Sequence, residues 1–388
     1  MSAKPPLRIV NARAWTASEP AARDVYTAGE RIAERAAPGA LTVDLAGHTI
    51  YPGWINAHDH LELNHYPRTK FREVYANAHE WGEDVNARLN AEPYHSLRAY
   101  PLRDRLFIGG LKNLLCGATT VVHHGPPHQL LYRHDFPVRV LRQYGWAHSL
   151  HFSTNAEIVR SYRRTPLSWP WFIHLAEGTD NTAAGEYQRL KALGCVGRNT
   201  VLVHGVGLTA ADIADAMPRI RALVWCPTTN NYLLGKTLNP ALWGDKLVLG
   251  SDSRLTADGD WLAELRSALC RGSADQPDVF AFTARPAALL GLKRAGSLAP
   301  GSYADWLAAP AFPTARRDIA LVVRGGVPLI GDPPLMAQFP HVPTVAAALD
   351  GAEKRVHLDL ARQIHRCCLR EPGLIVDALP TTRRLFLN

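Results

Sequence analysis

From residue 51 onward, short apolar runs rich in β-branched and aromatic residues alternate with amphipathic segments. Such runs predict buried strands and the segments between them predict helices, so the alternation is typical of βα units around a parallel sheet. Seven strands are predicted by the runs WINAH, TTVVHH, GWAHSLHF, PWFIHLAE, TVLVHG, ALVWCP and KLVLGSD, and PVRVLR is the candidate for an eighth. Eight strands over roughly 240 residues suit a (β/α)8 TIM barrel, whose usual size is about 250 residues.

The two ends of the chain have a different pattern, with short strand-like runs punctuated by Gly and Pro. We therefore expect an α/β protein in three parts. The parts are a (β/α)8 barrel over residues 51–294, a small accessory β-sandwich built from residues 1–50 and 295–335, and a C-terminal helical extension over residues 336–388. Within the extension, the sequence from 347 to 371 predicts one amphipathic helix.

Composition restricts the classes of partner. The 388 residues are 47% hydrophobic and carry a net charge of +8, with a pI near 9.3. The Arg residues are scattered rather than gathered in a stripe, which argues against nucleic acid and leaves an anionic small molecule compatible with the charge. No apolar run approaches the ~20 residues of a membrane span, and the first residues contain no stretch of signal-peptide length. We expect a cytoplasmic protein without a membrane partner, and a homodimer as the commonest oligomer.

The segment PGWINAHDHLELN places His58 and His60 at the end of the first predicted barrel strand. Alternate residues of a strand point to the same side, so these two side chains would project together while Asp59 turns away. An isolated His-x-His pair is more often a surface feature, so the pair needs support from elsewhere in the chain.

That support comes from three later strand ends. His174 closes WFIH, His204 closes VLVH, and Asp252 follows LVLGS. In a parallel barrel the carboxyl ends of all strands lie on one face, where active sites are built. A single His behind an apolar run is more often a core or rim residue, but the joint occurrence of these residues at strand ends favours a metal site.

The ordered pieces PGWINAHDH, HLAE, VLVHGVGL, CPTTN, LGSDSRLT and GSLAPGSYADW resemble the amidohydrolase superfamily, in particular its deaminase and chlorohydrolase branch, which includes cytosine and guanine deaminases. They extend from about residue 51 to 306, and as an ordered set they are specific. The resemblance implies a barrel with an accessory β-sandwich and one divalent metal held by His58, His60, His174 and Asp252.

Three imidazoles and one carboxylate suit Zn²⁺ or Fe²⁺, and zinc lowers the pKa of a bound water to about 7. Glu177, three residues after His174, lies where this branch carries the acid that moves a proton between the water and the substrate nitrogen. Capping of the following helix is the alternative role for Glu177. Asp252 could take the first proton from the water, and His204 could polarise the attacked carbon's substituent.

The same resemblance separates one-metal from two-metal relatives. Two-metal relatives usually bridge their ions with a carboxylated lysine on the fourth strand, and this chain has no lysine between Lys112 and Lys191. One metal is therefore expected.

Five other residues are weaker candidates for substrate contact. His123 and His124 end the second predicted strand, so one of them should point inward, although rim packing is about as common. Glu62 and Arg68 follow the first strand, where capping or a solvated role is the alternative. Asn230 follows the CPTT segment, where relatives carry a Ser-Asn pair.

The sequence therefore predicts a metal-dependent hydrolase acting on a small molecule, foremost a hydrolytic deaminase of a nitrogen heterocycle or an amidine-type compound. Hydrolysis of an amide, a cyclic amide or a carbon-halogen bond at the same one-metal site is the alternative. A non-catalytic barrel that serves as a binding protein is a third reading, but such proteins tend to lose ligands that are all present here.

Overall fold

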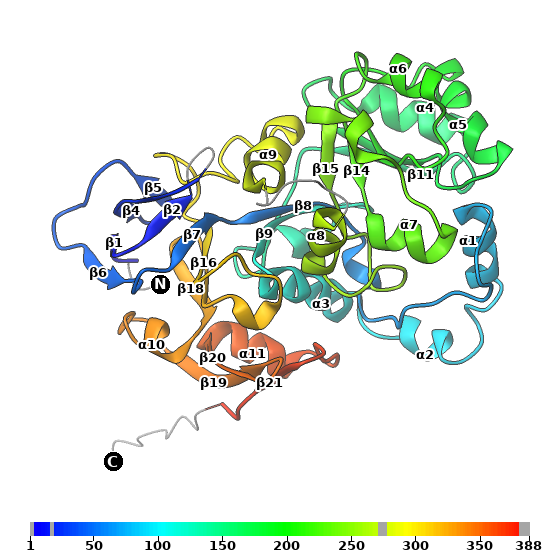
Figure 1. Cartoon of the computed structure of the whole chain (residues 1–388). Coiled ribbons are helices and arrows are strands. Elements are labelled where there is room, and N and C mark those ends of the chain that lie inside the picture. Colours follow the sequence, from blue (N-terminus) through cyan, green and yellow to red (C-terminus); the bar gives the residue numbers. More distant parts are fainter. Residues whose placement is uncertain (1–3, 16–18, 271–277, 380–388) are drawn as a thin grey trace. The chain divides into compact units, whose positions relative to one another are not determined.

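The computed structural model describes residues 4–15, 19–270 and 278–379 (Figure 1). The chain divides into two compact units, one from Pro52 to Ser297 and one made of Met1–Tyr51 and Leu298–Asn388. Within the described residues, no helix is both long and apolar enough to cross a membrane.

The unit from Pro52 to Ser297 contains two parallel sheets, with strand orders β10-β9-β8 and β11-β12-β13-β14-β15. One parallel bridge between Asp59 and Asp252 joins the end of β8 to the segment after β15. The spatial order of the strands therefore follows the chain order. The strands are β8 (Trp54–Asp59), β9 (Ala118–His123), β10 (Arg139–Val140), β11 (Gly145–Ser149), β12 (Trp171–Leu175), β13 (Thr200–His204), β14 (Ala222–Trp225) and β15 (Leu247–Leu249).

All eight predicted strand positions of this unit are strands, including the two-residue β10 within PVRVLR. The α/β class with parallel sheets is thus confirmed, but within the described chain the strands form two separate sheets rather than one closed ladder. The shortness of β10, which pairs with β9 through only two residues, limits the ladder on that side.

The amphipathic segments between the strands form helices, as the sequence predicts. Thr154 and Thr209 each begin a helix with a capping box, and Asp180 caps another through its side chain. The helices of this unit are α1 (Ala78–Asn86), α2 (Tyr94–Arg98), α3 (Leu102–Leu115), α4 (Asn155–Arg164), α5 (Asn181–Ala192), α6 (Ala210–Ala216), α7 (Pro227–Leu234), α8 (Trp261–Leu269) and α9 (Ala284–Leu290). Five short 3-10 turns accompany them in the described chain: Leu61–Leu63, Gln129–Tyr132, Pro240–Leu242, Gly244–Lys246 and Val279–Phe282.

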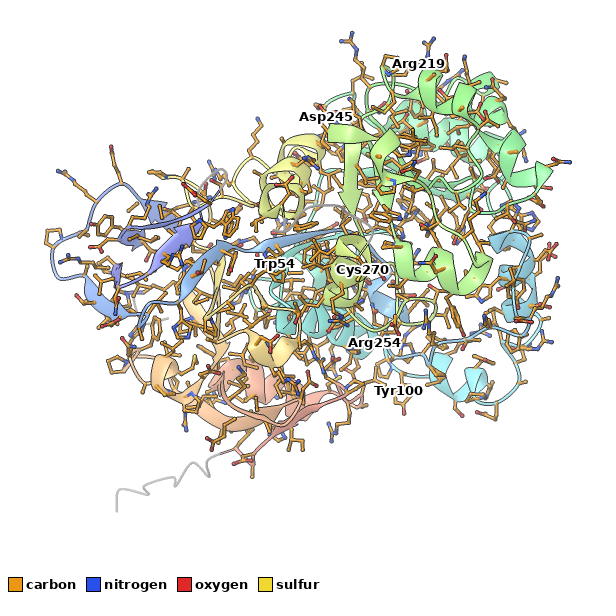
Figure 2. The ribbon with its side chains drawn as sticks, in the orientation of Figure 1. Trp54, Tyr100, Arg219, Asp245, Arg254 and Cys270 are labelled. Carbon is orange, nitrogen blue, oxygen red and sulfur yellow. The ribbon has the colours of Figure 1, made fainter. Side chains whose placement is uncertain are left out.

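The core of this unit lies along its parallel strands, which are buried over their whole length in β8, β9, β12, β13 and β14. Strands buried on both faces carry continuous apolar runs, which explains why these segments are readable in the sequence. Trp54 lies at the start of β8 (Figure 2) and is fully buried. Its ring centroid lies 4.9 Å from that of Trp261 on α8. The ionisable side chains of these strands lie at their carboxyl ends.

The terminal unit contains two sheets, with orders β5-β4-β1-β6 and β21-β19-β20-β18-β17-β16-β7-β2-β3. Both ends of the chain contribute to the larger sheet, and side chains from both sheets meet in one apolar cluster that includes Ile9, Val43, Trp306 and Leu321. The strands are β1 (Leu7–Val10), β2 (Arg13–Trp15), β3 (Pro20–Ala22), β4 (Val25–Ala28), β5 (Arg31–Ala33), β6 (Leu41–Asp44), β7 (Thr49–Pro52), β16 (Trp306–Ala309), β17 (Leu321–Arg324), β18 (Val327–Gly331), β19 (Thr344–Leu349), β20 (Ala352–His357) and β21 (Leu374–Val376).

The prediction of one helix over residues 347–371 is wrong for the first half of that segment. That stretch forms the hairpin β19–β20 and only then a helix, α11 (Leu358–Arg366), while α10 (Pro333–Met336) and a 3-10 turn at Arg316–Asp318 precede it. Asp350 and Gly351 connect the hairpin with φ of 50° and 83°. An Asp-Gly pair with positive φ at both residues is typical of the tight turn that joins antiparallel strands, and this turn overrides the helical periodicity. The predicted helical extension is therefore partly sheet.

Candidate metal centre and active site

His58 and His60 occupy alternate positions at the end of β8 and point to the same side, with ring centroids 5.0 Å apart. His58 is fully buried, whereas the His60 side chain keeps 11% of its surface exposed. Asp59 between them is also fully buried but belongs to the opposite face of the strand. The alternation that the sequence predicts is therefore present.

His174 at the end of β12 completes a cluster of imidazole nitrogens. Its Nε2 lies 3.3 Å from Nε2 of His58 and 3.2 Å from Nε2 of His60. Asp252, which follows β15, places its Oδ1 3.6 Å from Nε2 of both His58 and His60. The other oxygen, Oδ2, accepts a hydrogen bond of 2.9 Å from Thr256 Oγ1 and so fixes the carboxylate's orientation.

These separations fit a single metal ion. Donor atoms held about 2.0–2.1 Å from one zinc ion at tetrahedral angles lie roughly 3.3 Å from one another. Burial lowers the pKa of His58 and, more strongly, of His174, so these rings are held in the neutral form that binds metals. Burial alone would raise the pKa of Asp252, but the neighbouring His58 and His60 hold it below its ordinary value, which keeps the carboxylate anionic.

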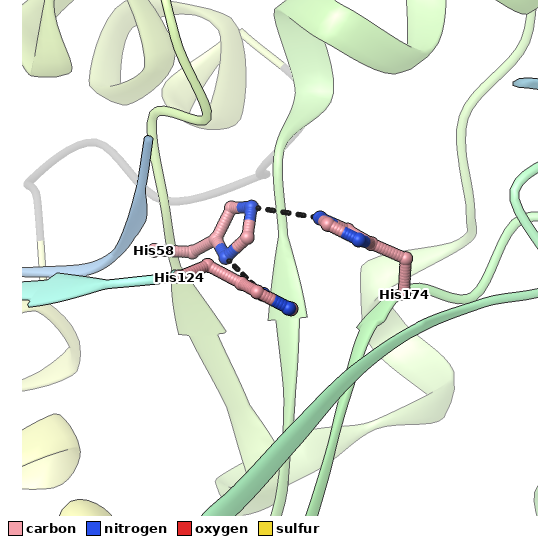
Figure 3. A group of neighbouring side chains, drawn as sticks. All are labelled: His58, His124 and His174. Atoms are coloured by element: carbon pink, nitrogen blue, oxygen red, sulfur yellow. Dashed lines mark hydrogen bonds between the residues drawn. The ribbon is translucent and has the colours of Figure 1, made fainter. Parts of the chain in front are cut away.

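The hydrogen bonds behind the rings direct nitrogen lone pairs into this cluster. His124 Nε2 lies 3.0 Å from the carbonyl oxygen of Ala147, which can only accept, so the proton of His124 is on Nε2. Its Nδ1 is then an acceptor for His58 Nδ1, 3.3 Å away, and Nε2 of His58 keeps its lone pair (Figure 3). In the same way, His174 Nδ1 donates to the carbonyl oxygen of His148 at 2.8 Å. Partners of this kind fix the tautomer of metal-binding histidines.

Among the residues that the structure describes, two overlapping groups of side chains could hold a metal: His58 with His60 and Asp252, and His58 with His124 and His174. We favour the first group joined by His174, because it converges on Nε2 atoms and includes a negative charge. In the second group, the Nδ1 atoms of His58 and His124 already face each other in a hydrogen bond.

Glu177 and His204 lie beside this cluster. Glu177 Oε2 is 3.4 Å from His204 Nε2, and His204 Nδ1 lies 2.8 Å from Asn230 Oδ1. The Asn230 amide nitrogen donates to Thr237 Oγ1 at 3.1 Å, which sets the amide so that its oxygen accepts from His204. Burial raises the pKa of Glu177 well above its ordinary value, with Asp252 and Glu186 adding to the effect, and burial lowers the pKa of His204 to about 4. The pair thus combines a carboxyl whose proton affinity is increased with a neutral imidazole.

Three residues at these strand ends have left-handed backbone conformations: Ala176 before Glu177 (φ 53°), His204 (φ 75°) and Asp252 (φ 52°). Such conformations are costly for residues other than glycine and tend to cluster at functional sites. They turn the chain sharply at the points where the polar side chains leave the strands.

A cavity of about 220 Å³ opens over the cluster. Three aromatic side chains contribute to its wall: Trp81, Trp146 and Phe152. Six imidazoles line it: His60, His79, His124, His148, His174 and His204. The charged lining residues in the described chain are all acidic: Glu62, Glu177, Glu186 and Asp252.

The weaker substrate-contact candidates divide into two groups. Glu62 and His124 line the cavity. Among the described lining residues, His123, Arg68 and Asn230 do not appear. His123 is buried with Nδ1 3.6 Å from Glu62 Oε2, Asn230 supports His204 from behind, and Arg68 stacks 3.9 Å over the Tyr232 ring and donates to the Thr256 carbonyl oxygen at 3.0 Å. His124 is therefore the inward-facing member of the histidine pair.

Several lining residues were missed from the sequence. His79 and Trp81 lie on α1, in the long segment after β8, and the ring of His79 contacts Glu186 of α5 at 3.1 Å. His148 lies on β11, three residues before His151 in the run GWAHSLHF. The apolar strand ends could have indicated His148, but no spacing rule connects α1 with α5.

Comparisons with known proteins give structural neighbours only, since no family model and no curated protein matches the chain. The chain is similar to a zinc-containing adenosine deaminase from Xanthomonas campestris, with a TM-score of 0.64, 17% identity, and coverage of 83% of this chain and 92% of that one. It is similar to a triazine hydrolase from Arthrobacter aurescens, with a TM-score of 0.67, 16% identity, and coverage of 84% and 94%.

A third similar structure is an N-isopropylammelide isopropylaminohydrolase from Burkholderia multivorans, with a TM-score of 0.58, 18% identity, and coverage of 84% and 98%. At these identities the likeness establishes a shared fold. The resemblance seen in the sequence motifs is thus confirmed at the level of the fold.

Proposed function

We propose that this chain is a one-metal hydrolase of the amidohydrolase superfamily, which removes an amino group from a nitrogen heterocycle or an amidine-type small molecule as ammonia. The observation that carries the proposal is the convergence of three imidazole Nε2 atoms and one carboxylate oxygen beneath a cavity that also holds Glu177 and His204. In this proposal the parallel strands of the unit from Pro52 to Ser297 are those of a (β/α)8 barrel, and the two sheets of the terminal unit form an accessory β-sandwich.

His58, His60, His174 and Asp252 would hold the metal, with Zn²⁺ as the first expectation and Fe²⁺ as the alternative. A divalent metal at this place supplies a Lewis acid and lowers the pKa of water toward neutrality. A single ion is expected because β11, the fourth strand in chain order, has no lysine, and Lys112 is fully buried against Asp59.

The chain's own residues then move the protons. Hydrolysis of a C–NH₂ group consumes one water, forms a C–O bond, breaks the C–N bond and releases ammonia. Glu177 accepts a proton as the water attacks and returns it to the leaving nitrogen, a role that suits a carboxyl whose pKa is raised by burial. His204 is held by Asn230 with its Nε2 toward Glu177 and the cavity, where it orients the group attached to the attacked carbon.

The lining of the cavity favours a neutral or cationic substrate. Its acidic side chains and the lack of Lys or Arg among the described lining residues disfavour the anionic substrate that the overall charge suggested. A volume of about 220 Å³ and three aromatic walls suit a small, flat ring. Glu62 at the rim is a candidate acceptor for a ring or amino N–H.

Hydrolysis of a carbon-halogen bond is the second candidate. The chain is also similar to an atrazine chlorohydrolase from Arthrobacter aurescens complexed with zinc, with a TM-score of 0.67, 17% identity, and coverage of 83% and 95%. In that reaction, water would displace halide from a ring carbon and no ammonia would form, so the products separate the two candidates.

The test is a panel of amino- and chloro-substituted pyrimidines, purines and triazines, incubated with the zinc-loaded chain and assayed for ammonia and halide. We expect ammonia release that stops when a chelator removes the metal and resumes when zinc is added. Ammonia release that continues in fully metal-free protein would refute the mechanism. Release of halide without ammonia would favour hydrolysis of a carbon-halogen bond over deamination. A cytoplasmic location and a homodimer stay predictions.

A further inference from the structure

A lysine with no exposed surface, Lys112 of α3, lies on the side of β8 opposite the candidate metal centre. Its Nζ is 2.9 Å from Asp59 Oδ2, donates to Asn64 Oδ1 at 2.7 Å, and lies 3.3 Å from Ser251 Oγ. Asp59, its partner, is also fully buried. The mechanism above uses neither charge.

Asp59 has a complete set of donors around its carboxylate. Oδ1 accepts from Asn64 Nδ2 at 2.8 Å. Oδ2 accepts from Asn113 Nδ2 at 2.7 Å and, at 3.2 Å each, from Asn56 Nδ2 and Ser251 Oγ. A buried carboxylate with this many partners is held in one orientation.

The same network joins the two elements that carry three of the four candidate ligands. Asn56 Oδ1 accepts from the backbone N–H of Ser251 at 3.0 Å, and the N–H groups of Ser251 and Asp252 both donate to the His58 carbonyl oxygen, at 2.9 and 3.0 Å. The N–H of His60 donates in return to the Asp252 carbonyl oxygen at 3.1 Å. The position of Asp252 relative to β8 therefore depends on contacts within this network.

An ion pair in this place is hard to explain by stability alone. Removing two charges from water is costly, and replacement of a buried pair by neutral side chains is often neutral or stabilising, whereas removal of one partner is strongly destabilising. Fixed geometry is a more specific benefit, because ligand atoms must be held within about 0.5 Å of their productive positions.

We propose that Asp59 and Lys112 are a positioning pair, which lies behind the ligand strand and sets metal affinity by holding the His58 and His60 segment against Ser251 and Asp252. The inference rests on the proposed metal site. It assigns a function to the middle residue of the His-Asp-His motif, whose side chain points away from the cavity.

The test compares three variants, Asp59→Asn, Lys112→Met and the double variant, by thermal melting and by zinc affinity from competition with a chromophoric chelator. Each single variant leaves one buried charge without its partner and should melt lower. The double variant should regain most of the melting temperature, yet all variants that fold should bind zinc roughly 10–100-fold more weakly than the unchanged chain. Co²⁺-loaded protein should also show an altered visible spectrum, which reports ligand geometry.

The control is another buried lysine, Lys354, which pairs with the partly exposed Asp332 in the terminal unit, with Nζ and Oδ1 2.6 Å apart. The double variant Lys354→Met and Asp332→Asn makes the same chemical change and should leave zinc affinity unaltered. Should the Asp59 and Lys112 variants fail to fold, Ser251→Ala removes one neutral link of the network and should weaken zinc binding by a few-fold.

A double variant that binds zinc as tightly as the unchanged chain, with an unaltered Co²⁺ spectrum, would overturn the inference and leave the pair a structural feature. In the fallback, unaltered zinc affinity in Ser251→Ala would overturn it likewise. Failure of the proposed metal site itself has a different signature, because the unchanged chain would then show no specific zinc binding.

Discussion

His124→Phe removes the acceptor of the His58 Nδ1 proton while keeping a ring in the same place. The ring of His124 stacks on that of His174 with centroids 4.1 Å apart and planes 3° from parallel, an arrangement that phenylalanine can keep. What is lost is the 3.3 Å contact between the two Nδ1 atoms. His58 is then free to carry its proton on Nε2, where it competes with the metal.

Loss of such a partner typically lowers metal affinity roughly 10–100-fold, which corresponds to about 1.4–2.8 kcal/mol of binding free energy. We expect zinc affinity, measured by competition with a chromophoric chelator at neutral pH, to fall within this range. The Ala147 carbonyl oxygen also loses its donor, so the melting temperature should fall independently of metal.

His123→Phe is the matched control. His123 is the preceding residue and is equally buried, but its Nδ1 faces Glu62 rather than a candidate ligand. This variant should lose stability and keep its zinc affinity. Equal affinities in the His123 and His124 variants would refute the role assigned to His124.

Three further changes test other parts of the site. Glu177→Gln should lower kcat roughly 10²–10⁴-fold while the metal content stays the same, because the residue moves protons and does not bind the ion. Glu264→Gln should flatten the pH dependence of stability. Burial raises the pKa of Glu264, which hydrogen-bonds to Thr228, from the ordinary 4.5 to about 8, so the folded chain holds a proton in this window that the unfolded chain has released. The free energy of unfolding of the unchanged chain should therefore decline with rising pH across this window, by at most about 1.4 kcal/mol per pH unit, and less so in the variant. Gly250→Ala should weaken zinc binding and cost about 1–3 kcal/mol, because the added Cβ would lie 2.7 Å from the His58 Cβ.

Each of these changes has its own comparison. A Glu177→Gln protein that retains full turnover would remove that residue from the mechanism. The exposed Glu353→Gln should melt with the same pH dependence as the unchanged chain, and a Glu264→Gln protein that also does so would contradict the assigned proton. Gly185→Ala on α5 meets no atom within 4 Å and should leave zinc affinity unaltered. If Gly250→Ala binds zinc as tightly as the unchanged chain, close packing of Gly250 against His58 does not contribute to the geometry of the metal site.

The sequence predicts those parts of the site that sit at strand ends. His58, His60, His174, His204 and Asp252 follow buried runs, and parallel strands bring their carboxyl ends together without any knowledge of loops. Local periodicity was sufficient for these five residues. The structure places four of them in the lining of one cavity, with His58 fully buried next to His174: His60, His174, His204 and Asp252.

The remaining parts depend on contacts between segments distant in the sequence. The cavity wall formed by His79 and Trp81 comes from α1, in a segment without a strong periodic pattern, and Lys112 meets Asp59 across a distance of more than fifty residues in the chain. Net charge does not indicate the local charge of the site, because the charged side chains among the described residues that line the cavity are acidic. The Asp350-Gly351 pair does indicate a hairpin turn in the sequence, but the helical periodicity of the residues around it favoured a helix.

The most direct test of the account is the metal content of the chain, measured by mass spectrometry on protein purified without added metal and then reconstituted with zinc. We predict one equivalent of tightly bound metal per chain, and its loss in His174→Ala and Asp252→Ala. Two equivalents per chain, or a single equivalent that persists in both variants, would contradict a one-metal site built from His58, His60, His174 and Asp252.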